Sequence, residues 1–336
     1  MPSARTKIIC LTPIRNEGWV LDSFLRAAEM WADHIILADQ RSTDDSATVA
    51  TRFRKVRLIT NDSGAFDENV RQRLLLAAAR EIEGPKLLVA LDADEFLTPT
   101  WHHAPEWQSA LRAAPGTVFS FDWVNVLPGT TRAYIPAEKV PFAFCDDGSD
   151  HHGGPIHARR IPVPPSAPIR AMRDVKVLHL QFTDWQRMKS KQRWYQCWEW
   201  LHNPGKRPIQ LYRQYHRMDA FPEDEVHAMD PAWLERYADW GIPLGATASR
   251  PPYWWDEEVL GWIIKHGTEM FRRLDIWDVP WGEIASALDV AVDTRAVADP
   301  RSRMDRAIHR WLARTQHGAG KTRTRQVQRA LALLGW

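Results

Sequence analysis

The sequence predicts an α/β fold in which a mostly parallel sheet carries helices on both faces, followed by a helical C-terminal region. Strand and helix patterns alternate over residues 5–95, and the strands are apolar throughout, as in a sheet that helices cover on both sides. From about residue 221 onward the pattern is helical. The chain has 336 residues, which is longer than one compact core usually holds, so a large domain with an appendage is expected.

Four short apolar runs predict the strands of the parallel sheet. They cover 7–12, 34–39, 56–60 and 87–91. Apolar residues at helical spacing predict the helices between them, at 21–31, 44–53 and 68–81. Ser42 or Thr43 is available to cap the second helix, and Gly84-Pro85 ends the third.

The pattern changes from residue 117, where loops that contain Pro and Gly replace helices between the strands. We expect strands at 117–126, 139–144 and 175–182, a helix at 183–203, and a long loop at 146–168 that is rich in Asp, His, Gly and Pro. These changes predict two halves of one α/β domain, at 1–125 and 126–216, and a helical region at 217–336.

The composition excludes several classes of protein. The chain is 44% hydrophobic and 26% charged, so it is neither disordered nor embedded in a membrane, and no apolar run approaches the length that crosses a bilayer. The N-terminal pattern is not that of a signal peptide, and three scattered cysteines predict neither a disulfide framework nor a zinc knuckle. A net charge of +2 excludes strong overall attraction to nucleic acid. We therefore expect a soluble cytoplasmic protein without a nucleic-acid partner.

The last segment of the chain is basic. Residues 301–336 carry nine Lys and Arg residues against one acidic residue, and Leu331, Leu334 and Trp336 lie near the end. Such a segment is either the solvated face of a helix or a basic amphipathic helix that touches anionic lipid or a phosphate-bearing acceptor. We expect at most peripheral contact with a membrane, at its inner face.

An acidic cluster follows the fourth predicted strand. Asp92-Ala93-Asp94-Glu95 comes directly after the apolar run at 87–91. Ligands of open parallel sheets bind beyond the carboxyl ends of the strands, and clustered carboxylates are costly there unless a cation neutralises them. Hard divalent cations prefer carboxylate and phosphate oxygens. One carboxylate would hold Mn²⁺ or Mg²⁺, and the other would contact a ribose hydroxyl.

Two polar segments follow the first two predicted strands and open toward the same edge of the sheet. Thr12-Pro13-Ile14-Arg15-Asn16-Glu17 follows the first strand, and Asp39-Gln40-Arg41-Ser42-Thr43-Asp44 follows the second. A carboxylate such as Asp39 accepts hydrogen bonds from a nucleotide base, and a guanidinium such as Arg15 pairs with phosphate. Either segment taken alone also fits an ordinary capped turn.

Taken in chain order, the segments 12–17 and 39–44 and the acidic cluster at 92–95 resemble the motifs of the family 2 glycosyltransferases, which have the Rossmann-like GT-A fold. The resemblance covers residues 5–100 and extends more loosely to about residue 200, and Gln40-Arg41 replaces the glycine that is usual in the second motif. It implies inverting transfer of a sugar from a nucleotide-diphosphate donor to a glycan, lipid-linked or other acceptor.

The resemblance also implies roles for individual residues. The first two loops would bind the nucleotide, and a divalent cation would be held by the acidic pair. Carried over by position, the nucleotide-binding residues are Thr12, Arg15, Glu17 and Asp39, while Arg71 contacts the donor, Asp92 the ribose and Asp94 the metal.

Two later residues are candidates for the same site. Alternation along 177–182 puts His179 and Gln181 on the face opposite the apolar side chains. The resemblance places a metal-binding His late in the catalytic domain, so we expect His179 to bind the metal opposite Asp94. Lys191, on the following helix, would face the diphosphate, although its place in an apolar stripe also fits core packing.

The loop at 146–168 supplies both carboxylates and imidazoles. As a loop that faces the acceptor, it would provide the general base, with Asp150 preferred over Asp147. A zinc site formed by His151, His152 and His157 is the alternative, but no pair of thiolates supports it.

Two other classes of function stay open at this point. A nucleotidyltransferase would use the same edge and metal, but its first loop is usually rich in glycine, and 12–17 contains none. A non-catalytic carbohydrate-binding protein would use the 18 tryptophans and the acidic cluster, as a calcium lectin does. A Rossmann dehydrogenase is disfavoured because no Gly-x-Gly-x-x-Gly follows the first strand.

Overall fold

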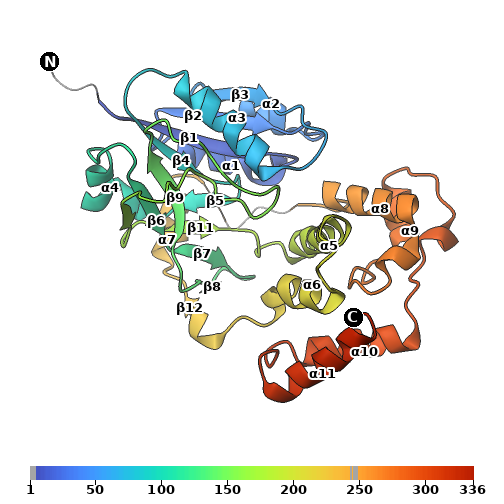
Figure 1. Ribbon diagram of the computed structural model, residues 1–336. Helices are drawn as coiled ribbons and strands as arrows, with labels where there is room; N and C mark the ends of the chain where they lie inside the picture. The colour runs from blue at the N-terminus through green and yellow to red at the C-terminus, as the bar shows by residue number, and fades with distance from the viewer. Residues whose placement is uncertain (1–4, 243, 245–248) are drawn as a thin grey trace. The chain divides into compact units, whose positions relative to one another are not determined.

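The structure is a computed structural model that describes residues 5–242, 244 and 249–336 (Figure 1). It divides the chain into two compact units, of which the first comprises 1–183 and 227–248 and the second comprises 184–226 and 249–336. The first unit contains the sheets and the second is built from helices. Residue 125, expected as the boundary between two halves of one domain, lies inside the first unit, whereas residues 184–216, expected in the second half, belong to the second unit.

A seven-stranded sheet forms the centre of the first unit, and its strands lie in the order β10-β6-β9-β4-β1-β2-β3. In chain order they are β1 (Lys7–Ile14), β2 (His34–Asp39), β3 (Val56–Thr60), β4 (Lys86–Ala90), β6 (Val118–Phe121), β9 (Val140–Cys145) and β10 (Ile169–Ala171). Neighbouring strands are parallel except at β9, which runs antiparallel to both β4 and β6. The sheet is therefore mixed, and the four predicted parallel strands lie together at one side of it.

Helices cover both faces of this sheet. Those packed on it are α1 (Gly18–Ala28), α2 (Ser46–Ala50) and α3 (Glu68–Arg80). Side chains alternate along β1, so Ile8 and Cys10 join the apolar core that contains α1, whereas Ile9 and Leu11 pack with α3. A strand that is buried on both faces needs apolar residues at every position, which is the pattern that predicted the parallel sheet.

A second, five-stranded sheet has the order β12-β8-β7-β11-β5. Its strands are β5 (Glu95–Leu97), β7 (Trp123–Val126), β8 (Arg132–Tyr134), β11 (Val177–His179) and β12 (Val226–Ala228). β11 pairs antiparallel with β5 and parallel with β7. The short helices α4 (Pro105–Ala110) and α7 (Ala232–Asp239) complete the first unit.

Three predicted elements differ from the structure. The strand expected at 117–126 is two strands in different sheets, and the chain breaks at Asp122, whose carboxylate accepts hydrogen bonds from two lysines. The helix expected at 44–53 is only α2 and begins after Asp45, because the Ser42 hydroxyl accepts a bond from the backbone of Asn16 instead of capping a helix. The strand expected at 175–182 is limited to β11.

The second unit is helical, as expected for the C-terminal region. Its helices are α5 (Trp185–His202), α6 (Pro208–Tyr215), α8 (Trp254–His266), α9 (Trp281–Ala287), α10 (Arg303–Arg314) and α11 (Thr322–Leu333). Within the described ranges, none of the helices is both long enough and apolar enough to span a bilayer.

Candidate functional site

The acidic motif forms a tight turn at the end of β4. The backbone N–H of Asp92 donates to Glu95 Oε2 at 2.8 Å, and the N–H of Glu95 donates to the carbonyl of Asp92 at 3.0 Å. Asp94 is 5% exposed and Glu95 is fully buried. Because β4, β1 and β2 are parallel, this turn lies at the same edge of the sheet as the loops that follow β1 and β2. We refer to it below as the carboxyl edge.

The second sheet brings His179 to the acidic turn. In the strand register, His179 of β11 is opposite Glu95 of β5 on one side and opposite Asn125 of β7 on the other. Residues that are opposite one another in neighbouring strands extend their side chains to the same face of the sheet. The backbone N–H of Leu180 also donates to the carbonyl of Asp94 at 2.9 Å, which fixes the turn to the end of β11.

Asn125 determines which nitrogen of His179 carries the proton. The Nδ1 of His179 lies 2.9 Å from Asn125 Oδ1, an atom that can only accept, so Nδ1 is the donor. The orientation of the Asn125 amide is fixed because its oxygen also accepts from Gln181 Nε2 at 2.7 Å and its nitrogen donates to the carbonyl of Trp123. Neutral His179 therefore keeps the lone pair on Nε2, and the ring stacks on Trp123 with centroids 4.7 Å apart.

The Nε2 atom of His179 faces the carboxylate of Asp94. The Nε2 atom lies 3.6 Å from Asp94 Oδ2 and, within the described part of the chain, is a buried atom without a hydrogen-bond partner. A divalent cation takes nitrogen and oxygen ligands at about 2.1 Å, so it fits between two atoms at this separation. No group of three or more His, Cys, Asp or Glu residues among those described is placed to hold a metal alone. Two protein ligands supplemented by phosphate oxygens and water fit the chemistry of Mn²⁺ or Mg²⁺.

Arg160 neutralises the other two carboxylates of the turn. Its Nη2 lies 2.6 Å from Asp92 Oδ2 and its Nη1 lies 3.0 Å from Glu95 Oε1. The guanidinium also lies over the rings of Trp123 and Phe142, at 5.5 and 5.0 Å from their centroids. Trp123 donates from Nε1 to Glu95 Oε1 at 2.8 Å, so one aromatic side chain contacts the carboxylate, the arginine and the histidine.

The charges of Glu95 and Arg160 depend on each other. Burial raises the pKa of Glu95 above its ordinary value, and attraction to Arg160 opposes this effect. Burial alone would lower the pKa of Arg160, but Asp92 and Glu95 outweigh it, so that pKa is raised. The ion pair with Arg160 therefore limits the rise in the pKa of this fully buried carboxyl group.

The loop at 146–168 runs along α3 from the end of that helix toward its start, and so places Arg160 at the site. It begins at the opposite edge of the sheet, where the backbone N–H of Asp146 donates to the carbonyl of Lys86, the first residue of β4. The N–H of Glu68, at the start of α3, donates to the carbonyl of Pro155, and Glu68 Oε2 accepts from the N–H of Ala158 at 2.7 Å. The chain thus crosses from the amino edge to the carboxyl edge between residues 146 and 158.

This path places Asp147 and Asp150, the two residues expected to provide the general base, away from the acidic turn. The carboxylate of Asp147 accepts from the N–H of Ser149 and lies beside Gly116, at the amino edge. Asp150 follows Ser149, whose carbonyl accepts from Arg80 at the end of α3. Both aspartates were expected near the acceptor, but β9 runs antiparallel to β4 and so places the start of the loop at the edge opposite Asp94. Neither aspartate belongs to the site described above.

The alternative zinc site does not form either. The Nδ1 of His151 lies 2.9 Å from Asn69 Oδ1, and its Nε2 pairs with the carbonyl of Arg159. Burial lowers the pKa of His151 below its ordinary value. Both ring nitrogens thus have protein partners, and His151 holds the loop against α3.

The two loops after β1 and β2 are tied to each other at the carboxyl edge. Asp39 Oδ1 accepts from the N–H and the hydroxyl of Ser42, at 3.1 and 2.6 Å, and the Ser42 hydroxyl accepts from the N–H of Asn16 at 2.9 Å. The turn holds Arg41 and Asn16 at φ of 56° and 54°, in the left-handed region. Asp39 therefore caps a turn, and its position at the end of β2 also places it at the carboxyl edge.

The other predicted nucleotide-binding residues occupy different environments. Thr12 is fully buried within β1, which extends to Ile14, so it lies in the strand and not in the loop as expected. Glu17 comes just before α1, and its Oε2 accepts from Trp19 Nε1 at 2.8 Å. Arg15 lies between them, directly after the end of β1.

Arg71 lies in the first turns of α3, at the carboxyl edge. Its guanidinium is 5.0 Å from the ring centroid of Phe66, and its Nη2 is 3.7 Å from Glu68 Oε1. The Nε of Arg71 is buried and has no hydrogen-bond partner among the described residues. A buried cationic donor with spare hydrogen-bonding capacity suits a phosphate ligand.

Lys191 belongs to the second unit, on α5. Its Nζ lies 5.9 Å from the ring centroid of Trp255, and Arg187, one turn earlier, lies 4.7 Å from the same ring. These contacts account for the place of Lys191 in an otherwise apolar stripe, and its predicted role toward the diphosphate stays a prediction.

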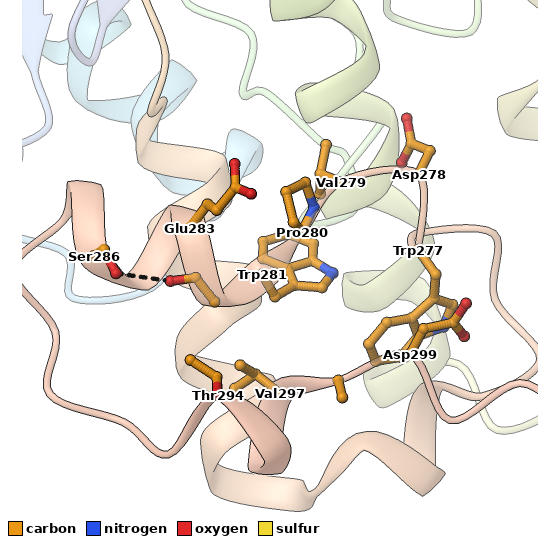
Figure 2. A pocket seen from close by; sticks show the side chains of 12 residues that line it. Trp277, Asp278, Val279, Pro280, Trp281, Glu283, Ser286, Thr294, Val297 and Asp299 are labelled. Atoms are coloured by element: carbon orange, nitrogen blue, oxygen red, sulfur yellow. Dashed lines mark hydrogen bonds between the residues drawn. The ribbon is translucent and has the colours of Figure 1, made fainter.

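A cavity of about 650 Å³ opens in the second unit, around α9 (Figure 2). Its lining includes Trp277 and Trp281, which are almost fully buried and donate from Nε1 to backbone carbonyls. Two of its carboxylates, Asp278 and Asp299, pair with Arg193 and Arg301. The two tryptophans present little ring surface to the cavity, and Asp278 and Asp299 are neutralised by arginines. The cavity therefore offers fewer groups that could bind a ligand than the acidic turn does.

Sequence reasoning missed three residues of the site, namely Trp123, Asn125 and Arg160. Asn125 and Trp123 lie within the strand predicted at 117–126, which by itself does not reveal that they are near His179. Arg160 lies in a loop with several basic neighbours, and no local pattern distinguishes it from them. The register of β7, β11 and β5 reveals the first two, and the path of the loop reveals the third.

The chain has distant structural similarity to solved enzymes with the GT-A fold, although no protein-family model and no curated protein matches it. One is glucosyl-3-phosphoglycerate synthase from Mycobacterium tuberculosis, in complex with Mn²⁺, UDP and glucosyl-3-phosphoglycerate. The match is 20% identical, covers 36% of this chain and 44% of that chain, and has a TM-score of 0.28. Another is 4-diphosphocytidyl-2C-methyl-D-erythritol synthase, with 17% identity, coverage of 43% and 74%, and a TM-score of 0.26. The chain thus spans less than half the length of the first enzyme, and similarity at this level identifies no activity.

Proposed function

We propose that the chain is an inverting, metal-dependent glycosyltransferase that moves a sugar from a nucleotide-diphosphate donor to an acceptor. The observation that carries the proposal is the position of His179 Nε2, a buried atom without a hydrogen-bond partner among the described residues, 3.6 Å from Asp94 Oδ2 at the carboxyl edge of parallel strands. Parallel α/β sheets bind nucleotides at this edge. The ordered motifs around Asp39 and Asp92 support a nucleotide as the ligand.

In the proposed mechanism, Asp94 and His179 would hold Mn²⁺ or Mg²⁺, and the ion would supply positive charge against the leaving diphosphate. Asn125 keeps His179 in the tautomer that can bind a cation, through the hydrogen bond to Nδ1. Arg71 would donate to a donor phosphate, and Asp39 would accept from the base. Arg160 holds Asp92 and Glu95 so that the turn presents Asp94 in one position.

A screen for thermal stabilisation tests the proposal. A ligand at 100 times its Kd stabilises the native state by about 2.7 kcal/mol. We expect at least one nucleotide sugar, from a panel that includes UDP-glucose, UDP-N-acetylglucosamine, GDP-mannose and dTDP-rhamnose, to raise the melting temperature by about 5 °C or more only when Mn²⁺ is present. Stabilisation by nucleoside triphosphates with release of pyrophosphate would indicate a nucleotidyltransferase instead.

The role of His179 can be separated from a structural role. We expect His179→Ala to raise the Mn²⁺ concentration that gives half-maximal stabilisation or turnover by about tenfold or more, because a metal ligand is lost. His151→Ala is the matched control, since it also removes a buried histidine but one whose nitrogens both have protein partners. It should lower the melting temperature and leave the Mn²⁺ requirement unchanged. If His179→Ala behaves like the control, the histidine is structural.

Asp39 has a known structural role, so its function in binding needs two variants. Asp39→Asn keeps an oxygen that can accept from Ser42, whereas Asp39→Ala removes the turn cap. If Asp39 contacts the base, both variants should weaken the binding of UDP or the preferred nucleoside diphosphate about tenfold in calorimetry. Wild-type affinity in Asp39→Asn, with a loss only in Asp39→Ala, would limit Asp39 to capping the turn.

A further inference from the structure

The most exposed apolar side chains of the described chain include three on or directly after α11. Leu333 is 89% exposed, Leu334 60% and Val327 43%. Ala330, which is also exposed, lies three residues after Val327 and four before Leu334. Val327, Ala330 and Leu334 therefore share one side of the helix. Such side chains do not contribute to the core of the protein, and a contiguous exposed group of them marks an interaction site.

Arginines border these apolar side chains. Arg323 and Arg329 are exposed on the same helix, where Arg323 lies two turns before Ala330 and Arg329 one turn before Leu333. We use the name α11 face for these two arginines together with Val327, Ala330, Leu333 and Leu334. The α11 face has no acidic residue.

The whole terminal segment is cationic at its surface. Residues 301–336 carry nine Lys and Arg side chains, and the single acidic side chain, Asp305, is buried. Asp305 caps the start of α10 by accepting from the N–H and hydroxyl of Ser302, and it lies 3.4 Å from Arg272 Nε. No negative side chain of this segment therefore offsets the positive charge of the α11 face.

The adjoining side of α11 is anchored within the second unit. Leu331 and Trp336 pack against the apolar core that Ile209, Tyr212, Ile308 and Leu312 form between α6 and α10. Arg213 of α6 donates to the carbonyl of Leu312 and to the side chains of Thr315 and Gln316, at 2.7–2.8 Å. The α11 face is thus presented outward by a folded pair of helices and is not the leftover side of a frayed end.

We infer that the α11 face binds the surface of a membrane that contains anionic lipid. Lipid headgroups supply negative charge for the arginines, and the acyl boundary beneath them accepts leucine and valine side chains at a shallow depth. A nucleic acid would match the charge but would gain nothing from the exposed leucines. A second copy of the α11 face would place like charges against one another. The inference does not depend on the proposed glycosyltransferase activity.

Flotation with lipid vesicles tests this inference on the full chain. With vesicles of 30% phosphatidylglycerol in phosphatidylcholine, at 0.1 M salt, we expect the bound fraction to be at least ten times that with pure phosphatidylcholine. Binding should fall steeply at 0.5 M salt, because screening weakens the attraction between arginines and headgroups. The double variants Leu333→Ser with Leu334→Ser, and Arg323→Glu with Arg329→Glu, should each reduce binding about tenfold or more.

Matched substitutions at another exposed site control for a general change of surface. Ile169 is 58% exposed in β10, and Arg170 and Arg173 beside it are also exposed. Ile169→Ser, and Arg170→Glu with Arg173→Glu, should leave vesicle binding unchanged, and all variants should keep the circular dichroism spectrum of the wild type. Equal binding to both kinds of vesicle, or no loss in either α11 variant, would overturn the inference. A loss that affects only the arginine variant, together with equally strong binding to DNA, would also overturn it.

Discussion

Replacement of Asp94 by alanine should reduce sugar transfer by a factor of about 10³ or more while the protein stays folded. A cation at the leaving diphosphate contributes several kcal/mol to the transition state, and Asp94 is its carboxylate ligand in the proposed site. The fold should survive because, after burial itself, repulsion from Asp92 and then from Asp94 raises the pKa of Glu95. Loss of Asp94 relieves that repulsion. The measurement is nucleoside diphosphate release from whichever nucleotide sugar the wild type turns over.

The control for Asp94→Ala is Asp239→Ala, which removes an exposed carboxylate of α7 in the same unit. It should leave both turnover and the melting temperature unchanged. The metal-induced rise in melting temperature should be absent in Asp94→Ala and present in the control. Turnover at the wild-type rate in Asp94→Ala, or wild-type turnover that persists in excess EDTA, would rule out a metal ion at this carboxylate.

Replacement of Arg160 by methionine should destabilise the protein by about 3 kcal/mol at neutral pH, because a buried carboxylate loses its partner. For a unit of this size, that change lowers the melting temperature by about 6–12 °C. The exposed ion pair between Arg57 and Glu81, at 2.7 Å, provides the matched control. Arg57→Met should change stability by less than about 0.5 kcal/mol, since exposed pairs contribute little.

The effect of Arg160→Met should depend on pH in a defined direction. Burial already raises the pKa of Glu95 in the native state, and removal of Arg160 raises it further. An acid whose native-state pKa is above its unfolded value costs stability as pH rises through that range and costs none below it. The deficit relative to wild type should therefore be larger at pH 8 than at pH 5. A deficit that is the same at both pH values would show that Arg160 acts only by packing on Trp123 and Phe142.

The sequence predicted the parallel part of the sheet because its signal is local. Strands β1, β2 and β4 are short apolar runs, and burial on both faces leaves this pattern whatever the distant contacts are, whereas β3 is a more exposed edge strand. The position of the acidic turn follows from the same pattern, because it lies directly after β4. The second sheet left no comparable signal, because β5, β8 and β11 are only three residues long.

Contacts that join distant segments could not be read from local patterns. Sequence reasoning placed the general base at Asp147 or Asp150 because their loop supplies carboxylates and was expected to face the acceptor, but the direction of the strand before it was unknown. Since β9 is antiparallel, the loop starts at the far edge and only its later residues approach the acidic turn. The contact of Arg160 with Asp92 spans 68 positions in the sequence. His179 was predicted from alternation alone, whereas its partner Asn125 depends on the register of β7 and β11.

The position of β9 and the loop after it has a consequence for the order in which the chain can fold during synthesis. β4 pairs with β9 on the side away from β1, and Glu95 pairs with Arg160. β9 and Arg160 therefore emerge from the ribosome long after the first four strands. A nascent chain that ends near residue 125 would have an open edge at β4 and a buried carboxylate without a counter-charge, which is unfavourable. We therefore expect stable folding of the first unit to wait until at least residue 160 has been added, and the alternating N-terminal half not to fold by itself.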